Sequence, residues 1–276
     1  MHHNGTVTRV RRACSFLILW AAAAHAQRFV ILGDRTGSVQ PGVYEQVWRE
    51  TAAEKPAFVL TVGDMIEGLV DANAASEWAE ARRIYQPYAA IPLYLTPGNH
   101  DIWSAASEAL FRNNSKRPPH YSFDAGAAHF TILDNSRSEE ISQDELSFLE
   151  ADLKANASRT VKFIVSHRPS WILNVALRNT DFPLHRLAKQ YGVKYVLAGH
   201  IHQLLNFELD GVRYVSMPSA GGHLRASGEY QAGWFFGYTT VQIEGAAAQF
   251  TVHELKAPKG RGRVTALGDW GMLGLK

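Results

Sequence analysis

The most informative residues are Asn99, His100 and Asp101, which stand together after the short apolar run "IPLYLT" (91–96) and the turn residues Pro97 and Gly98. Asn, His and Asp are poor strand formers, and Asn and Asp are seldom buried. Three of them in succession at the end of a predicted strand therefore suggest a chemical role. An amide oxygen, an imidazole nitrogen and a carboxylate are all metal ligands, and an imidazole can also transfer a proton.

Four other apolar runs are followed in the same way by Gly, Asp or His. They are "RFVIL" (28–32), "AFVLTV" (57–62), "VKFIVS" (161–166) and "VKYVLA" (193–198). In open α/β sheets, ligands bind beyond the carboxyl ends of the strands, so we expect these side chains to converge on one rim. The resulting set of candidate metal ligands is Asp34, Asp64, Asn99, His167, His200 and His202.

This set predicts a metal site with more than one ion. Two carboxylates, an amide oxygen and three imidazoles are mixed oxygen and nitrogen donors, which suit Mn, Fe or Zn. A two-metal site needs a carboxylate that can bridge ions about 3.5–4 Å apart. Taken singly, a Gly-Asp after a strand is usually a turn and a lone His is usually a surface residue. Their order and shared position at strand ends favour a metal site over chance.

The stretches between the apolar runs predict the elements that position these residues. Helices are expected at 41–55, 75–88, 142–156 with a Ser142 to Glu145 capping box, and 181–192 ending at Gly192. Hairpins are expected at Asp210-Gly211 and Glu244-Gly245, which are turn sequences between strand-like runs. The sequence therefore predicts an α/β fold in which two mixed β-sheets pack as a sandwich with flanking helices.

The first 26 residues have the pattern of a secretory signal peptide. Arg9, Arg11 and Arg12 precede an apolar run (13–24), and a small-x-small cleavage pattern ends at residue 26. The run is shorter than the about 20 apolar residues that span a bilayer. We expect export to the periplasm or the medium, with no stable membrane insertion after removal of the leader. The predicted divisions are a signal peptide (1–26), one catalytic domain (27–256) and a Gly-rich C-terminal tail (257–276).

The charge balance gives no reason to expect a nucleic-acid partner. The chain has 28 Lys and Arg against 26 Asp and Glu, and three of the Arg lie in the predicted leader, so the remainder is close to neutral. Such a balance provides no general attraction to a phosphate backbone or an acidic membrane. The single Cys, Cys14, also lies in the leader, so the exported protein is not expected to hold a disulfide.

With these motifs in place, the chain resembles an exported bacterial member of the calcineurin-like metallophosphoesterase superfamily. Gly-Asp, "GNHD", a lone His and "GHIH" follow the family order across residues 33 to 202. The resemblance implies a double β-sheet sandwich that binds two divalent or trivalent metal ions and hydrolyses a small phosphorylated substrate. Within the family pattern, Asp64 would bridge the ions. The other ligands implied for the first ion are Asn99, His167 and His200. Those implied for the second ion are Asp34 and His202.

The same resemblance implies a role for His100. In the family this residue is not a ligand but faces the leaving-group oxygen, which explains why it stands beside Asn99. The implied mechanism is metal-assisted hydrolysis, in which a metal-activated hydroxide attacks phosphorus and His100 supplies a proton or a hydrogen bond to the leaving oxygen.

Two positions depart from the family pattern. Thr36 stands where a ligand His is usual, a feature shared with the first block of purple acid phosphatases. One metal site is then short of a protein ligand or takes it from elsewhere, and the rival interpretation is a catalytically impaired metal- or phosphate-binding protein on the same fold. Glu67 stands where related phosphatases have an acid that pairs with the catalytic His. It is a candidate to hold and polarise His100, or else an exposed carboxylate at a helix start.

Four further residues lie close to the motifs. Arg35 and Arg168 each adjoin a predicted ligand and could bind the substrate phosphate as a fork, or form a surface ion pair. Trp171 could line a substrate pocket or be a partly buried loop aromatic. His223 follows a strand-like run and could reach the same rim. The sequence leaves open which ester is cut, whether monoester, diester or pyrophosphate, and which metals are native.

Overall fold

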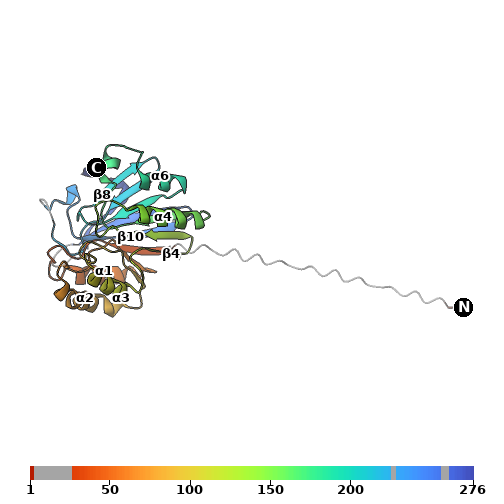
Figure 1. The fold of residues 1–276 in the computed structure, drawn as a ribbon. Coiled ribbons are helices and arrows are strands. Elements are labelled where there is room, and N and C mark those ends of the chain that lie inside the picture. Colours follow the sequence, from red (N-terminus) through yellow and green to blue (C-terminus); the bar gives the residue numbers. More distant parts are fainter. Residues whose placement is uncertain (3–26, 225–227, 256–260) are drawn as a thin grey trace.

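The computed structural model describes residues 1–2, 27–224, 228–255 and 261–276 (Figure 1). The predicted signal peptide falls almost entirely on residues 3–26, outside the described residues, and it stays a prediction. Within the described part of the chain, no helix combines the length and the apolar character needed to cross a membrane.

Two six-stranded mixed sheets form the body of the domain. The first has the order β12-β11-β10-β1-β2-β3 and the second the order β4-β5-β6-β7-β9-β8. In the first sheet the parallel strands are β1 (Gln27–Leu32), β2 (Val59–Thr61) and β3 (Leu93–Tyr94), and the antiparallel additions are β10 (Gly237–Glu244), β11 (Ala247–Leu255) and β12 (Arg261–Ala266). In the second the parallel strands are β5 (Ala128–Ile132), β6 (Val161–Val165), β7 (Tyr195–Ala198) and β9 (Val212–Ser216), flanked by antiparallel β4 (Tyr121–Ala125) and β8 (Leu205–Leu209).

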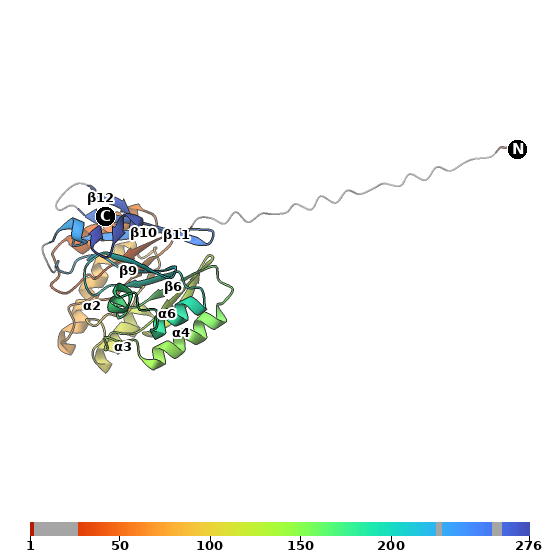
Figure 2. The same ribbon diagram turned by 90° about the horizontal axis from the view of Figure 1, so that it is seen from above.

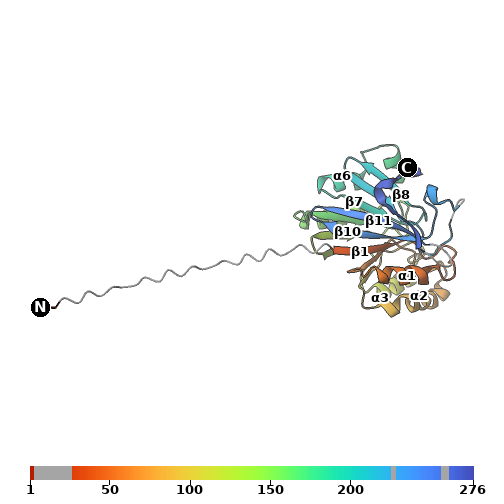
Figure 3. The ribbon, with the colours of Figure 1, turned by 180° about the vertical axis from the view of Figure 1, so that it is seen from behind.

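Helices cover the outer face of each sheet, which gives four layers (Figures 1 and 3). The first sheet carries α1 (Val43–Ala53), α2 (Asp71–Tyr85), the 3₁₀ turn η1 (Gln86–Tyr88) and α3 (Ala105–Ser115). The second carries α4 (Gln143–Ala155), α5 (Ile172–Ala176) and α6 (Pro183–Gln190). Figure 2 shows β10, β11 and β12 together, away from α4 and α6. The predicted α/β sandwich is confirmed.

An aromatic core joins the two sheets. The rings of Phe29 and Phe58 stack at 4.7 Å in the first sheet, and those of Phe130 and Phe163 stack at 4.6 Å in the second. Phe29 also meets Phe130 edge to face at 5.3 Å, so the stacks contact each other across the sandwich. Strands such as β6 are buried along their whole length. This explains why they appear as continuous apolar runs rather than alternating ones.

The structure contains two helices that the sequence analysis does not predict. α3 begins at the N-cap Ser104, whose hydroxyl accepts a hydrogen bond from Ser107 N at 3.1 Å, but its Ser and Asn content lowers helix propensity. α5 has five residues, too few for a helical period to be recognised. At α4, Ser142 Oγ accepts from Glu145 N at 3.2 Å, while the carboxylate of Glu145 accepts from Asp134 N, so only half of the expected capping box forms.

Residues 261–276, which the sequence analysis places in a tail, are part of the domain. β12 extends the first sheet, and the 3₁₀ turn η3 (Leu267–Asp269) leads into the hairpin of β13 (Trp270–Gly271) and β14 (Gly274–Leu275). Trp270 is fully buried and packs on Tyr230 of the 3₁₀ turn η2 (Tyr230–Ala232) at 5.2 Å between ring centroids. Asn206 Nδ2 on β8 donates to the Trp270 carbonyl at 3.1 Å. Strand pairing and the buried Trp270 therefore fix a segment whose Gly content suggested a tail.

Candidate metal centre

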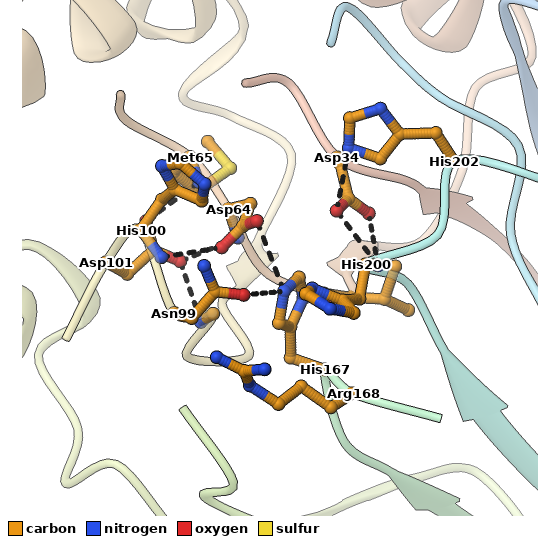
Figure 4. A network of polar contacts seen from close by, with 12 residues as sticks. Asp34, Asp64, Met65, Asn99, His100, Asp101, His167, Arg168, His200 and His202 are labelled. Carbon is orange, nitrogen blue, oxygen red and sulfur yellow. Dashed lines mark hydrogen bonds and ion pairs between the residues drawn. The ribbon is translucent and has the colours of Figure 1, made fainter. Parts of the chain in front are cut away.

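The candidate metal centre lies where the carboxyl ends of β1, β2 and β3 face those of β6 and β7 (Figure 4). Each predicted ligand lies in the loop that follows one of these strands, and the structure brings all six side chains to this one place. Four of them, Asp34, Asp64, His167 and His202, are buried, whereas Asn99 and His200 are half-buried.

The best-formed part of the centre is built by Asp64, Asn99 and His167. Nδ1–H of His167 donates to the Val62 carbonyl at 2.8 Å, which turns Nε2 toward the other two side chains. Nε2 lies 3.2 Å from Oδ2 of Asp64 and 3.1 Å from Oδ1 of Asn99. Lone pairs of Nε2, Oδ2 and Oδ1 therefore face one another unless a cation lies between them, either a proton on Nε2 or a metal ion that displaces it. These residues therefore fit a metal ion.

His200 joins this group as a neutral imidazole. One potential ligand atom from each of Asp64, His167 and His200 lies within 4.8 Å of the other two. Burial and then the neighbouring His167 lower the pKa of His200 to about 4, so it is ready to ligate at neutral pH. Burial alone would lower the pKa of His167, but the Asp64 carboxylate raises it to about 9. Burial alone would raise the pKa of Asp64, but His167 lowers it to about 2.

Asp34 and His202 form a second, smaller half of the centre. The His200 main-chain N–H donates to both carboxylate oxygens of Asp34, at 3.0 and 2.9 Å. Nδ1–H of His202 donates to the His223 carbonyl at 2.7 Å, and Nε2 lies 3.3 Å from Oδ2 of Asp34. Across residues 27–224, 228–255 and 261–276, no third carboxylate or imidazole joins this pair at the spacing found around Asp64. This agrees with Thr36 at the position where the family pattern has a ligand His.

The motif glycines are required because the carboxylates of the candidate ligands fill the space beside them. A Cβ on Gly98 would lie 2.1 Å from Oδ1 of Asp64, and a Cβ on Gly199 would lie 2.4 Å from Oδ1 of Asp34. Both distances are well below van der Waals contact, so any larger residue would displace a ligand.

Asp101 holds the second and third motifs together. Its carboxylate is fully buried and accepts hydrogen bonds from Asp64 N (2.8 Å), Met65 N (2.8 Å) and Gly98 N (2.9 Å). Burial and then the nearby Asp64 raise the pKa of Asp101 to about 7. The backbone of Asp64 is in the left-handed region at φ 60°, a conformation that needs such support in a residue other than Gly. The last residue of "GNHD" is therefore a positioning residue.

Asn135 has the same role for the fourth motif, and the sequence analysis missed it. Its Oδ1 accepts from His167 N at 3.0 Å and from Arg168 N at 3.1 Å, and its Nδ2 donates to the Arg168 carbonyl at 2.8 Å. Asn135 follows β5 closely, so the pattern that revealed the ligands, a polar residue after an apolar run, also marks this position.

His100 lies at the rim of the centre and is held at two points. Its main-chain N–H donates to Oδ1 of Asp64 at 2.9 Å, and its ring Nδ1 contacts the main-chain carbonyl of Glu67. The Glu67 carboxylate accepts hydrogen bonds from Ser38 N at 3.2 Å and Val39 N at 2.6 Å, in the loop after Thr36, so the structure does not show the expected contact between this carboxylate and the His100 ring among the described residues. Glu67 thus positions His100 through its backbone.

The two arginines that adjoin predicted ligands, Arg35 and Arg168, have different surroundings. The Arg35 side chain is 3% exposed and donates to the Met65 carbonyl and to Glu80, both at 2.9 Å. It thus makes the ion pair that was the second expectation for this residue and joins the first motif to α2, while phosphate binding by Arg35 stays a prediction. Arg168 lies beside Asn99 and His167 at the centre (Figure 4), and its Nη1 contacts Glu139.

Trp171 and His223 also have defined positions. Trp171 is fully buried and packs 5.2 Å from the ring of Tyr214, so it belongs to the core under α5 and does not line a substrate pocket. His223 N donates to the Gly37 carbonyl at 3.0 Å, and its ring lies 5.7 Å from that of His202. His223 therefore reaches the rim of the centre.

Comparison with known proteins agrees with this geometry. The sequence is 32% identical over 137 residues to the 3',5'-cyclic adenosine monophosphate phosphodiesterase CpdA of Escherichia coli K12, covering 46% of this chain and 50% of that protein. It is 26% identical over 214 residues to purple acid phosphatase 23 of Arabidopsis thaliana, covering 60% of this chain and 47% of the relative. The chain thus spans about half the length of these relatives.

Two solved structures share the fold. Purple acid phosphatase PPD1 from yellow lupin superimposes with a TM-score of 0.63 at 17% identity, over 86% of this chain and 52% of that one. GAP50, the anchor in the inner membrane complex of Plasmodium, superimposes with a TM-score of 0.60 at 14% identity, over 91% of this chain and 89% of that one. The sequence profile of the calcineurin-like phosphoesterases matches residues 27–204, well over half of the chain. This protein therefore belongs to the calcineurin-like phosphoesterase family.

Proposed function

We propose that this protein is a metal-dependent hydrolase of small phosphate esters with a dinuclear centre. The observation that carries the proposal is the convergence of Asp64 Oδ2 and Asn99 Oδ1 on the inward-facing Nε2 of His167, at 3.2 and 3.1 Å. Carboxylate, amide and imidazole donors suit Mn, Fe or Zn. Asp64, Asn99, His167 and His200 would hold one ion, and Asp34 and His202 would hold a second that shares Asp64.

Bound cations would lower the pKa of a water from about 15.7 toward about 7 and neutralise the phosphoryl oxygens. The chain itself orients the reacting groups. Main-chain carbonyls fix the tautomers of His167 and His202, and Asp101 fixes the Asp64 loop. His100 is half-buried with Nδ1–H against the Glu67 carbonyl, so its imidazolium form would give the Nε2 proton to the leaving oxygen and become the neutral ring.

The relatives support a small phosphorylated substrate. One is named a cyclic AMP phosphodiesterase and another a purple acid phosphatase, so both diesters and monoesters are within reach of this fold. The near-neutral charge of the predicted domain argues against nucleic acid. We also propose that residues 1–26 direct export and are removed, because their pattern is that of a signal peptide. The N-terminal sequence of the protein recovered outside the cytoplasm tests this.

The proposed activity is tested with the purified protein loaded separately with Mn, Fe or Zn. Hydrolysis of p-nitrophenyl phosphate, bis(p-nitrophenyl) phosphate and cyclic AMP is measured together with the metal content. We expect metal-dependent turnover of at least one ester, its loss in Asp64→Asn, and wild-type turnover in the control Asp181→Asn, which alters an exposed carboxylate. One ion per chain with no turnover of any ester would instead favour the catalytically impaired binding protein suggested by Thr36.

A further inference from the structure

Arg168 is a largely buried cation with unused hydrogen-bond donors beside the metal centre. Its side chain is 16% exposed, and Figure 4 shows it next to Asn99 and His167. Its Nε is buried and has no hydrogen-bond partner among the described residues. A guanidinium has five N–H donors in a planar fork that matches a carboxylate or a phosphate. Arg35 shares an unpaired buried Nε but bonds through both Nη groups, whereas Arg168 bonds only through Nη1 among the described residues. Arg168 therefore keeps more donors for an anionic ligand, since a buried unpaired donor is unfavourable.

Hydrogen bonds from one side chain fix the main chain of Arg168. Asn135 accepts hydrogen bonds from the main-chain N–H groups of His167 and Arg168, and it donates to the Arg168 carbonyl. The same side chain therefore orients a candidate metal ligand and the adjacent arginine. These bonds fix the main chain from which the Arg168 side chain extends along the candidate centre (Figure 4).

Glu139 is the acid that contacts this guanidinium in the structure. It lies in the loop between β5 and α4, its side chain is 76% exposed, and its carboxylate contacts Nη1 of Arg168. An ion pair with one partner so exposed is weak, because water screens it and the side chain loses freedom. Moving Glu139 away into solvent is therefore easy, and a carboxylate presents the same kind of acceptor as a phosphate.

We infer that Arg168 binds the phosphoryl group of the substrate and that Glu139 competes with the substrate for it. The inference rests on the proposed function of the centre and adds a substrate class to it. A dianionic monoester displaces a carboxylate from an arginine more readily than a monoanionic diester does, because the attraction grows with charge. The Arg168–Glu139 pair thus favours phosphate monoesters over diesters.

The test uses Glu139→Ala, with Glu140→Ala as its matched control. Glu140 is the neighbouring acid, is exposed, and forms no ion pair with the described residues. Binding of inorganic phosphate to the Mn-loaded full chain is measured by calorimetry. Loss of a weak exposed pair predicts about two- to fivefold tighter binding in Glu139→Ala and no change in Glu140→Ala. Arg168→Met should weaken phosphate binding about tenfold or more, and adding Glu139→Ala to it should then have no effect.

A second readout is kcat/KM for p-nitrophenyl phosphate against its bis ester. We expect the ratio to fall in Arg168→Met and to stay unchanged in Glu140→Ala. Equal phosphate affinity in Glu139→Ala and Glu140→Ala, or wild-type affinity in Arg168→Met, would overturn the inference even if esters are hydrolysed. Phosphate binding that responds as expected without turnover of any ester would overturn the proposed function alone.

Discussion

Replacing Asp101 by Asn tests whether this residue positions the centre. The carboxylate accepts three main-chain hydrogen bonds of 2.8, 2.8 and 2.9 Å, one through Oδ1 and two through Oδ2. An amide has one oxygen, so at least one buried N–H must face an NH₂ group. Losing a hydrogen bond to a charged group costs about 1.5–3 kcal/mol. Removing the repulsion from Asp64 offsets part of this, which leaves an expected destabilisation of about 2 kcal/mol.

For a domain of this size, that loss lowers Tm by about 4–8 °C. Because Asp64 is displaced, metal affinity should also fall by about 10- to 100-fold, as is typical when a partner of a ligand is changed. Calorimetric melting and competitive metal titration measure the two effects. The control is Asp181→Asn, whose side chain is 85% exposed. If Asp101→Asn melts and binds metal like this control, the positioning role is refuted.

Three other substitutions give independent tests. His100→Ala should lower kcat by about 10²- to 10⁴-fold with bound metal retained; joint loss of metal and activity would show that His100 is a ligand. Gly199→Ala places a Cβ 2.4 Å from a ligand oxygen and should cost about 1–3 kcal/mol and reduce the metal content, whereas Gly268→Ala, with open space at its Cβ, should not. Burial alone would lower the pKa of His129, but its hydrogen bond to Asp152 raises it. The stabilisation from His129 is therefore complete below its unfolded pKa of about 6.5 and is lost as the pH rises through the folded pKa. Urea unfolding should accordingly show that His129→Gln is more destabilising at pH 6 than at pH 9, and an equal loss at both would contradict this.

The positions of the ligands could be predicted because their pattern is local. Each follows an apolar run, and parallel strands bring their carboxyl ends to one edge. Side-chain direction could not be predicted, because it depends on loop conformation. Arg35 is adjacent to Asp34 in sequence, yet it turns to Glu80 on α2. Glu67 contacts His100 through its carbonyl and sends its carboxylate to another loop.

Residues that support the centre were harder to identify for a related reason. Asp101 and Asn135 each follow an apolar run, but they act through hydrogen bonds to main-chain groups more than 30 positions away along the chain, and no local pattern reveals those partners. The C-terminal strand β12 and the anchor Trp270 lie among glycines that suggest a tail, and only long-range packing shows otherwise.

The central claim is that Asp34, Asp64, Asn99, His167, His200 and His202 form one cation-binding centre. Anomalous diffraction from crystals of the Mn-loaded protein tests it most directly. We expect two anomalous peaks, one among Asp64, Asn99, His167 and His200 and one beside Asp34 and His202. Peaks only at other places on the protein, or none after loading, would contradict it.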